Sequence, residues 1–203
     1  ASHLPFNRNG IKLFNADGGL EHDDITEILE IAAEISDDDA DNILDKMLEK
    51  SNDAPRFDLL SVYAEHLKAA IVKGCGNEKP LTGLHIVVDS GNGASGFFVD
   101  KILQPLGANT EGSQFLEPDG MFPNHIPNPE NKEAMKAIQE AVLENKADLG
   151  LIFDTDVDRM SAVFADGSEI NRDSIIALIS AILAPEYPGS TIITDSVTSD
   201  RLT

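Results

Sequence analysis

The spacing of apolar residues predicts helices in the first part of the chain. Apolar side chains recur there at intervals of three and four residues, which is the repeat of a helix with one buried face. Amphipathic helices are expected over residues 20–35, 37–50 and 59–72. Residues 1–14, which are rich in Asn, Gly and Pro, predict a loop that ends in a short strand.

The pattern changes after residues 73–80, a stretch with two glycines and a proline that is typical of a linker. Short apolar runs, typical of buried strands, then alternate with helical repeats. Strands are expected at 84–89, 108–110, 149–153 and 191–195, with a hairpin over 160–165 and 168–170. Helices are expected at 97–106, 130–145 and 173–183, and residues 118–129 predict a Pro/Asn-rich loop. This alternation predicts a three-layer α/β/α domain with a mostly parallel mixed sheet.

The charge balance argues against two classes of partner. Acidic residues outnumber Lys and Arg 36 to 15, which gives a formal net charge of -21. Such a chain is repelled by nucleic acid and by anionic membrane surfaces, so neither is expected as a partner. No apolar run is long enough to span a membrane, and no signal peptide is expected. The one cysteine, Cys75, fits a reducing cytoplasm.

Three aspartates at alternate positions follow the strand expected at 149–153. Asp154, Asp156 and Asp158 are closed by Arg159, and the carboxyl end of a buried strand is where open α/β sheets place their chemistry. Clustered carboxylates repel one another unless a cation lies between them, and hard oxygen ligands select Mg²⁺ or Ca²⁺. The stretch predicts a metal loop, although a solvated acidic turn is the alternative. An EF-hand loop is excluded, because its sixth and twelfth positions would be Arg159 and Ala165 instead of Gly and Glu.

A glycine-rich turn follows the strand expected at 84–89. Residues 91–96 read G-N-G-A-S-G, which matches the dinucleotide fingerprint, and Glu111 lies at a suitable distance for a ribose contact. Against a dinucleotide site, Asp89 would lie close to the pyrophosphate. The same glycines could also serve close packing alone, and this interpretation is favoured.

Four stretches together resemble the α-D-phosphohexomutases, the phosphoglucomutase/phosphomannomutase superfamily. They are A-S-H at residues 1–3 followed by N-G-I-K at 9–12, D-S-G-N-G-A-S-G at 89–96, P-D-G-M-F-P-N-H-I-P-N-P-E at 118–130, and A-D-L-G-L-I-F-D-T-D-V-D-R at 147–159. The resemblance covers essentially the whole chain. Departures from the family pattern are Leu4, where Asn is common, and Thr155 and Val157, where small residues are common.

The resemblance implies a domain organisation. Residues 1–76 would be the C-terminal part of a first domain, largely helical and similar in kind to the second. Residues 77–189 would be the second, α/β/α domain with the metal loop, and 190–203 the start of a third. The remaining domains of the same protein would then be partners of this chain, and the residues that read the sugar would lie there. The chain alone is expected not to turn over hexose phosphate.

The resemblance also implies a mechanism. Ser2 would carry a phosphoryl group whose oxygen completes a Mg²⁺ site with Asp154, Asp156 and Asp158. The substrate would be a phosphosugar, and hexose 1-phosphate and hexose 6-phosphate would be interconverted. A hexose bisphosphate would serve both as activator and as reaction intermediate. Lys12 would be the general acid/base, Arg159 would hold phosphate oxygens, and His3 would position the serine loop. His22, His66, His85 and His125 receive no catalytic role.

Two other functions stay open at this point. The first is a non-catalytic Mg²⁺-binding fragment or scaffold, because the substrate-reading domains are not in the chain. The second is a phosphatase of the haloacid dehalogenase type, whose nucleophilic aspartate also follows an apolar strand in an Asp-x-Asp pattern. In that class the nucleophile would be Asp154, and a downstream Lys and a further acidic pair would be needed.

Overall fold

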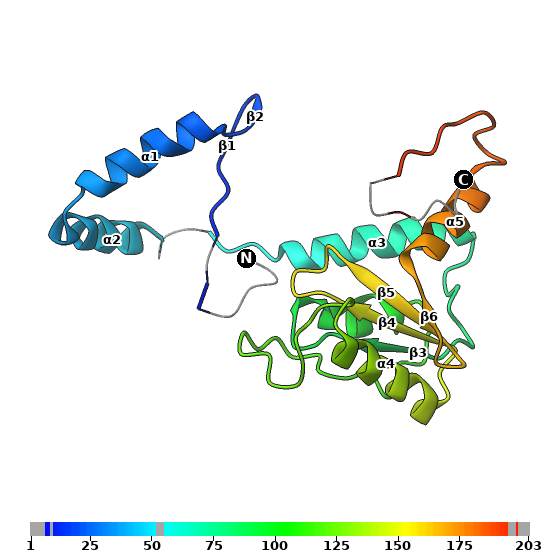
Figure 1. Ribbon diagram of the computed structural model, residues 1–203. Coiled ribbons are helices and arrows are strands. Elements are labelled where there is room, and N and C mark those ends of the chain that lie inside the picture. Colours follow the sequence, from blue (N-terminus) through cyan, green and yellow to red (C-terminus); the bar gives the residue numbers. More distant parts are fainter. Residues whose placement is uncertain (1–6, 9, 52–54, 195–197, 199–203) are drawn as a thin grey trace. The chain divides into compact units, whose positions relative to one another are not determined.

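The computed structural model describes residues 7–8, 10–51, 55–194 and 198 (Figure 1). Contacts divide the chain into two compact units, Asn7–Leu59 and Leu60–Thr203. In the part of the chain that the structure describes, no helix has the length and apolar character needed to cross a membrane. The domain boundary expected between 76 and 77 stays a prediction.

The first unit contains a small hairpin and two helices. Strand β1 (Phe14–Asn15) pairs antiparallel with β2 (Gly18–Gly19), and helices α1 (His22–Glu34) and α2 (Asp37–Ser51) follow. A capping box between Glu21 and Asp24 begins α1, and α2 begins with Asp37, Asp38 and Asp39, whose charge suits the helix dipole. The two helices agree with the sequence prediction. None of the described residues of this unit is buried.

The second unit is built on a four-stranded mixed sheet. Its strands are β3 (Ile86–Asp89), β4 (Leu149–Phe153), β5 (Met160–Phe164) and β6 (Glu169–Ile170), in that spatial order. β3 and β4 are parallel, whereas β4–β5 and β5–β6 are antiparallel. The hairpin expected at Asp166-Gly167 is confirmed, with Gly167 at a φ of 82°.

The sheet is mixed as expected, but it is less parallel than the alternation predicted, because only one of its strand pairs is parallel. The strand predicted at 108–110 is wrong. Asn109 and Gln114 each form one isolated parallel bridge beside β3, and the turn that separates them prevents a continuous ladder. Residues 191–194 are not a strand either, and Asp195 lies outside the described residues.

Helices pack on both faces of the sheet. The helical elements of this unit are α3 (Leu59–Cys75), a 3₁₀ turn η1 (Ala94–Gly96), a π-helix η2 (Phe98–Leu103), α4 (Lys132–Asn145) and α5 (Arg172–Leu183). The helix expected at 97–106 is therefore shorter than predicted and of a different type. α4 packs on one face of the sheet and η2 on the other, which confirms the α/β/α arrangement.

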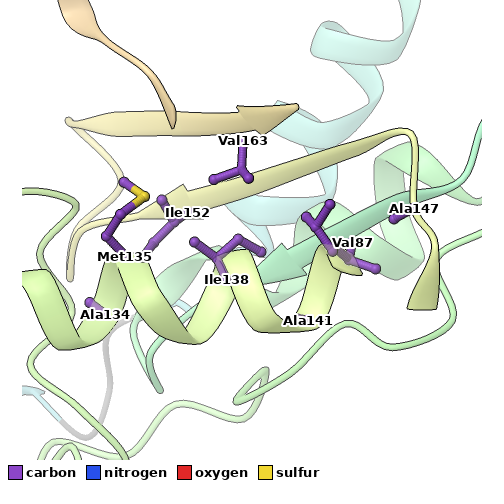
Figure 2. Packing of buried hydrophobic residues seen from close by; sticks show 9 residues of the cluster. Val87, Ala134, Met135, Ile138, Ala141, Ala147, Ile152 and Val163 are labelled. Carbon is purple, nitrogen blue, oxygen red and sulfur yellow. The ribbon is translucent and has the colours of Figure 1, made fainter. Parts of the chain in front are cut away.

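The core between α4 and the sheet explains why β4 contains a glycine. Val87, Ile152 and Val163 point from three neighbouring strands toward Ile138 and its neighbours on α4 (Figure 2). A Cβ atom on Gly150 would lie 2.5 Å from Val142 Cγ2 and 3.0 Å from Ile138 Cγ1. Gly150 therefore lets the helix approach the strand closely.

The opposite face is packed by aromatic and branched side chains. Val88 of β3 and Val99 and Leu103 of η2 belong to one buried cluster, and Phe98 stacks on Phe153 with ring centroids 4.8 Å apart. Behind η2, Ala64 of α3 packs against Ile102 and Leu106 of the η2 segment. These two cores fix the carboxyl ends of β3 and β4, where the loops of interest begin.

Candidate functional site

The three predicted aspartates lie together in the tight loop after β4. The backbone N–H of Asp154 donates to the carbonyl of Arg159 at 3.1 Å, which closes the loop. One carboxylate oxygen from each of Asp154, Asp156 and Asp158 lies within 4.8 Å of the others. Asp154 is fully buried, whereas Asp156 and Asp158 are exposed, so the cluster opens toward solvent on one side.

Arg159 holds the buried aspartate in place. Its backbone N–H donates to Asp154 Oδ1 at 3.1 Å and its Nε donates to Oδ2 at 3.0 Å. The same Nε lies 3.6 Å from Asp158 Oδ1. Its guanidinium therefore reaches two of the three carboxylates. The role expected of Arg159, to hold phosphate oxygens, stays a prediction.

The charges of Asp154, Asp158 and Arg159 influence one another. Burial disfavours the charge on Asp154, but hydrogen bonds from Arg159 and the Asp158 side chain outweigh burial, so the pKa of Asp154 lies below its ordinary value. The neighbouring Asp154 carboxylate raises the pKa of Asp158, by hydrogen bonding and by repulsion. Hydrogen bonding to Asp154 raises the pKa of Arg159. Carboxylates that compete in this way are stabilised by a cation between them.

The donor set fits a hard divalent cation. All three candidate ligands are carboxylate oxygens, and two of them are accessible from solvent. Val157, between two of the aspartates, has a φ of 69°. This left-handed conformation costs roughly 1–3 kcal/mol for a side chain other than glycine. It gives a physical reason why small residues suit this position, which is one of the departures noted in the sequence.

The glycine-rich turn packs against this loop. The backbone N–H of Ala94 donates to the carbonyl of Thr155 at 2.9 Å. A Cβ atom on Gly93 would lie 3.0 Å from that carbonyl oxygen, and one on Gly96 would lie 2.1 Å from the carbonyl oxygen of Leu116. The glycines are therefore accounted for by close packing, which was the interpretation favoured over a dinucleotide site.

Gly96→Ala should lower the free energy of unfolding by about 1–3 kcal/mol, because the added methyl group meets backbone that cannot move away freely. Gly120→Ala is the matched control: nothing lies within 4 Å of its Cβ position, and a change within about 0.5 kcal/mol is expected. Urea denaturation of both variants measures the difference. Equal stability of the two would show that Gly96 is not there for packing.

A pocket of about 530 Å³ opens beside the loop. Arg159 and Met160 line it, together with Asn128 of the Pro/Asn-rich loop, Glu130 just after that loop, and Asn171 before α5. Its volume is in the range of small-molecule sites. Its lining combines apolar side chains with hydrogen-bonding and charged ones, which suits a polar molecule of moderate size.

The other predicted site residues lie within the first twelve positions of the chain. Ser2 and His3 lie outside the described residues. Lys12 is described in the first unit, where it is exposed. Their roles stay predictions. His125, for which no catalytic role was predicted, is buried against Asp89 at the end of β3. The sequence around His125 is that of a Pro/Asn-rich loop, and nothing in it predicts a contact with Asp89.

Comparisons with known proteins identify the family. Residues 61–167 match the model of the phosphoglucomutase/phosphomannomutase α/β/α domain II. A phosphomannomutase from Salmonella montevideo is 35% identical over 96% of this chain, and a phosphoglucomutase from Neisseria gonorrhoeae is 32% identical over 99%. A solved structure of a phosphoglucomutase/phosphomannomutase family protein from Burkholderia thailandensis is similar over 63% of this chain, with 33% identity and a TM-score of 0.55.

The curated relatives match nearly the whole chain, as the resemblance in the sequence did. The chain spans 42% and 40% of the length of the two curated relatives, and 27% of the Burkholderia chain. The matched domain contains the glycine-rich turn, the Pro/Asn-rich loop and the aspartate loop. With more than half of its residues matched, this chain belongs to the phosphoglucomutase/phosphomannomutase family.

Proposed function

We propose that this chain forms the phosphoserine and metal-binding part of a phosphohexomutase that interconverts hexose 1-phosphate and hexose 6-phosphate in the cytoplasm. The observation that carries the proposal is the loop after β4, in which three aspartates converge and Arg159 turns toward them, in a chain of this family. The relatives' names, phosphomannomutase and phosphoglucomutase, support this substrate class.

Mg²⁺ would be held by Asp154, Asp156 and Asp158 together with a phosphoryl oxygen on Ser2. When bound, it would neutralise charge on the transferring phosphoryl group. The chain's own residues would do the rest. Ser2 Oγ would give its phosphoryl group to a sugar hydroxyl, and Lys12 would take the proton released from that hydroxyl.

The resulting hexose bisphosphate would then reorient and return its other phosphate to Ser2. Arg159 is suited to hold phosphate oxygens, because a guanidinium can form two parallel hydrogen bonds to them. His3 would position the serine loop. The pocket beside Arg159 supports the presence of a polar substrate near the metal loop.

The structure disfavours the phosphatase alternative. In that mechanism Asp154 would attack phosphorus, but it is fully buried and both of its oxygens accept hydrogen bonds from Arg159. A nucleophile needs a free lone pair directed at an accessible substrate. Asp154 is better suited to be a ligand that is fixed in position.

The proposal is tested by assaying the complete protein with hexose 1-phosphate, Mg²⁺ and a catalytic amount of hexose bisphosphate. Formation of the 6-phosphate that depends on the bisphosphate is expected. Mass spectrometry of the phosphoenzyme should place the phosphate on Ser2. Phosphate on Asp154 would indicate a phosphatase, and no turnover in the presence of bound metal would indicate a scaffold.

Asp156→Asn should weaken Mg²⁺ binding by at least about tenfold, because the exposed carboxylate supplies both a ligand and a charge. Titration calorimetry, or Mn²⁺ titration followed by electron paramagnetic resonance, measures the affinity. Asp166→Asn is a suitable control, since Asp166 is an exposed acid in the β5–β6 turn whose carboxylate accepts from Ser168. Unchanged affinity in Asp156→Asn would place the metal elsewhere.

A further inference from the structure

A buried ion pair joins the Pro/Asn-rich loop to the end of β3. The Nε2 atom of His125 lies 3.0 Å from both carboxylate oxygens of Asp89. The two side chains are 4% and 0% exposed, respectively. Asp89 is the last residue of β3, so this contact lies at the same edge of the sheet as the metal loop that follows β4.

The hydrogen-bond partners fix the protonation of the ring. Nδ1 of His125 lies 3.1 Å from the carbonyl oxygen of Ile126, which can only accept. The Asp89 carboxylate also accepts from the N–H of Gly91 and from Nε2 of Gln114, each at 2.8 Å, so both of its oxygens act as acceptors here. Both ring nitrogens of His125 therefore face acceptors, which requires an imidazolium.

The charges around the ring agree with this. Burial disfavours the charged ring, but the hydrogen bond to Asp89, the charge of Asp89 and the Ile126 carbonyl outweigh burial and raise the pKa of His125 above 6.5. The charged groups that face the ring from neighbouring elements are Asp89 at the end of β3 and Glu133 in the first turn of α4. Both are acidic.

The pair is connected to the metal loop through the turn at 90–94. A Cβ atom on Gly91 would lie 2.9 Å from His125 Cε1, so the ring lies directly against the turn. The next residue, Asn92, has a φ of 62° and is held by four hydrogen bonds, all to residues of the segment 115–124. Two residues later, the N–H of Ala94 donates to Thr155, between the first two aspartates of the metal loop.

We propose that His125, as an imidazolium paired with Asp89, is a positioning residue that holds the turn at 90–94 against the metal loop. It keeps the backbone of Asp154–Asp158 in the conformation that brings the three carboxylates together. The consequence for metal binding rests on the proposed function, but the effect on the loop does not. Loss of the proton from His125 removes one donor and the attraction to Asp89, and the turn loosens.

The proposal predicts a direction for pH dependence. Because the pKa of His125 is raised in the folded protein, its stabilisation is fully present below the unfolded value near 6.5 and is lost as pH rises through the folded pKa. The ordering of the turn should be lost over the same interval. An ordinary carboxylate site behaves differently, since its affinity for metal levels off once the carboxylates are ionised.

The test uses His125→Gln and Asp89→Asn, with His66→Gln as the control because His66 is an exposed histidine of α3. Hydrogen exchange of the Ala94 amide, corrected for its intrinsic rate, should be at least about tenfold faster in the first two variants and unchanged in the control. Mg²⁺ affinity should fall by about tenfold in His125→Gln. In the parent protein the Mg²⁺ affinity should decrease as pH rises and His125 loses its proton, and this decrease should be missing in His125→Gln.

A second experiment uses the parent protein and therefore does not depend on whether the variants fold. Nuclear magnetic resonance should show the His125 ring doubly protonated at pH 6, and the protection of the Ala94 amide should fall in step with the titration of that ring. A neutral His125 ring at pH 6, or Ala94 exchange that is unchanged in both variants, would overturn the proposal. Absence of Mg²⁺ binding in the parent protein would overturn the proposed function alone, since the exchange result still decides the role of His125.

Discussion

Ser2→Ala is expected to lower mutase turnover of the complete protein by roughly three orders of magnitude or more. In the mechanism we propose, both half-reactions pass through a phosphoryl group carried on Ser2 Oγ, and alanine has no atom that can carry it. Removal of a covalent carrier is not compensated by neighbouring groups that act only by positioning. The rate of 6-phosphate formation from hexose 1-phosphate, with the bisphosphate activator present, measures the effect.

Ser190→Ala provides the control for this experiment, because Ser190 is an exposed serine after α5 and far along the chain from the proposed site. Its turnover should equal that of the parent protein. Both variants should have the parent's thermal unfolding midpoint, which separates loss of chemistry from loss of fold. Parent-like turnover and phosphate labelling in Ser2→Ala would reject the phosphoserine assignment.

Ile138→Ala should have the largest effect on stability, a decrease of about 2–5 kcal/mol in the free energy of unfolding. Ile138 is fully buried in the middle of α4 and faces Val87, Ile152 and Val163 of the sheet (Figure 2). Truncation removes apolar contacts and leaves a cavity, and Gly150 opposite contributes no side chain that could fill it.

The matched control for Ile138 lies on the same helix. The Lys136 side chain is 72% exposed, and its Nζ atom lies 3.4 Å from Glu140 Oε1, which is also exposed. Surface ion pairs of this kind contribute little, so Lys136→Ala should change stability by no more than about 0.5 kcal/mol. Urea denaturation measures both variants. A loss of less than about 1 kcal/mol in Ile138→Ala would show that α4 is not part of the cooperative core.

Much of the secondary structure could be predicted because it follows from local patterns. The helical repeat identified α1, α2, α3, α4 and α5, and Asp-Gly between two apolar runs identified the β5–β6 hairpin. The metal loop was predicted for a similar reason. Alternate aspartates after an apolar strand carry their spacing in the sequence itself, so the tight loop that joins Asp154 to Arg159 could be expected.

Features that depend on distant contacts could not be predicted in this way. The segment at 108–110 has strand-like composition, but Gly112, with a φ of 84°, turns the chain before a ladder can form. An apolar repeat also does not distinguish an α-helix from the π-helix η2. The pairing of His125 with Asp89 joins residues 36 positions apart, and neither residue carries a local sign of the other.

The site residues divide along the same line. The three aspartates follow from spacing and charge, and the structure brings them together beside Arg159. The role of Arg159 in holding phosphate follows only from the resemblance to the family. Ser2, His3 and Lys12 follow only from the resemblance to the family, because a serine, a histidine and a lysine near the start of a chain have no distinguishing pattern. Their assignment depends on the experiments proposed above.

The absence of buried residues in the described part of Asn7–Leu59 has a calorimetric consequence. The enthalpy and heat-capacity change of unfolding arise mainly from surface that becomes hydrated. The surface of these residues is already largely exposed to water in the folded protein, so their unfolding adds little to either quantity. The unfolding endotherm of the isolated chain should therefore come almost entirely from the sheet and the helices that cover it. Divided by all 203 residues, the enthalpy should fall clearly below the value of about 0.7 kcal/mol per residue that is usual for globular domains near 60 °C.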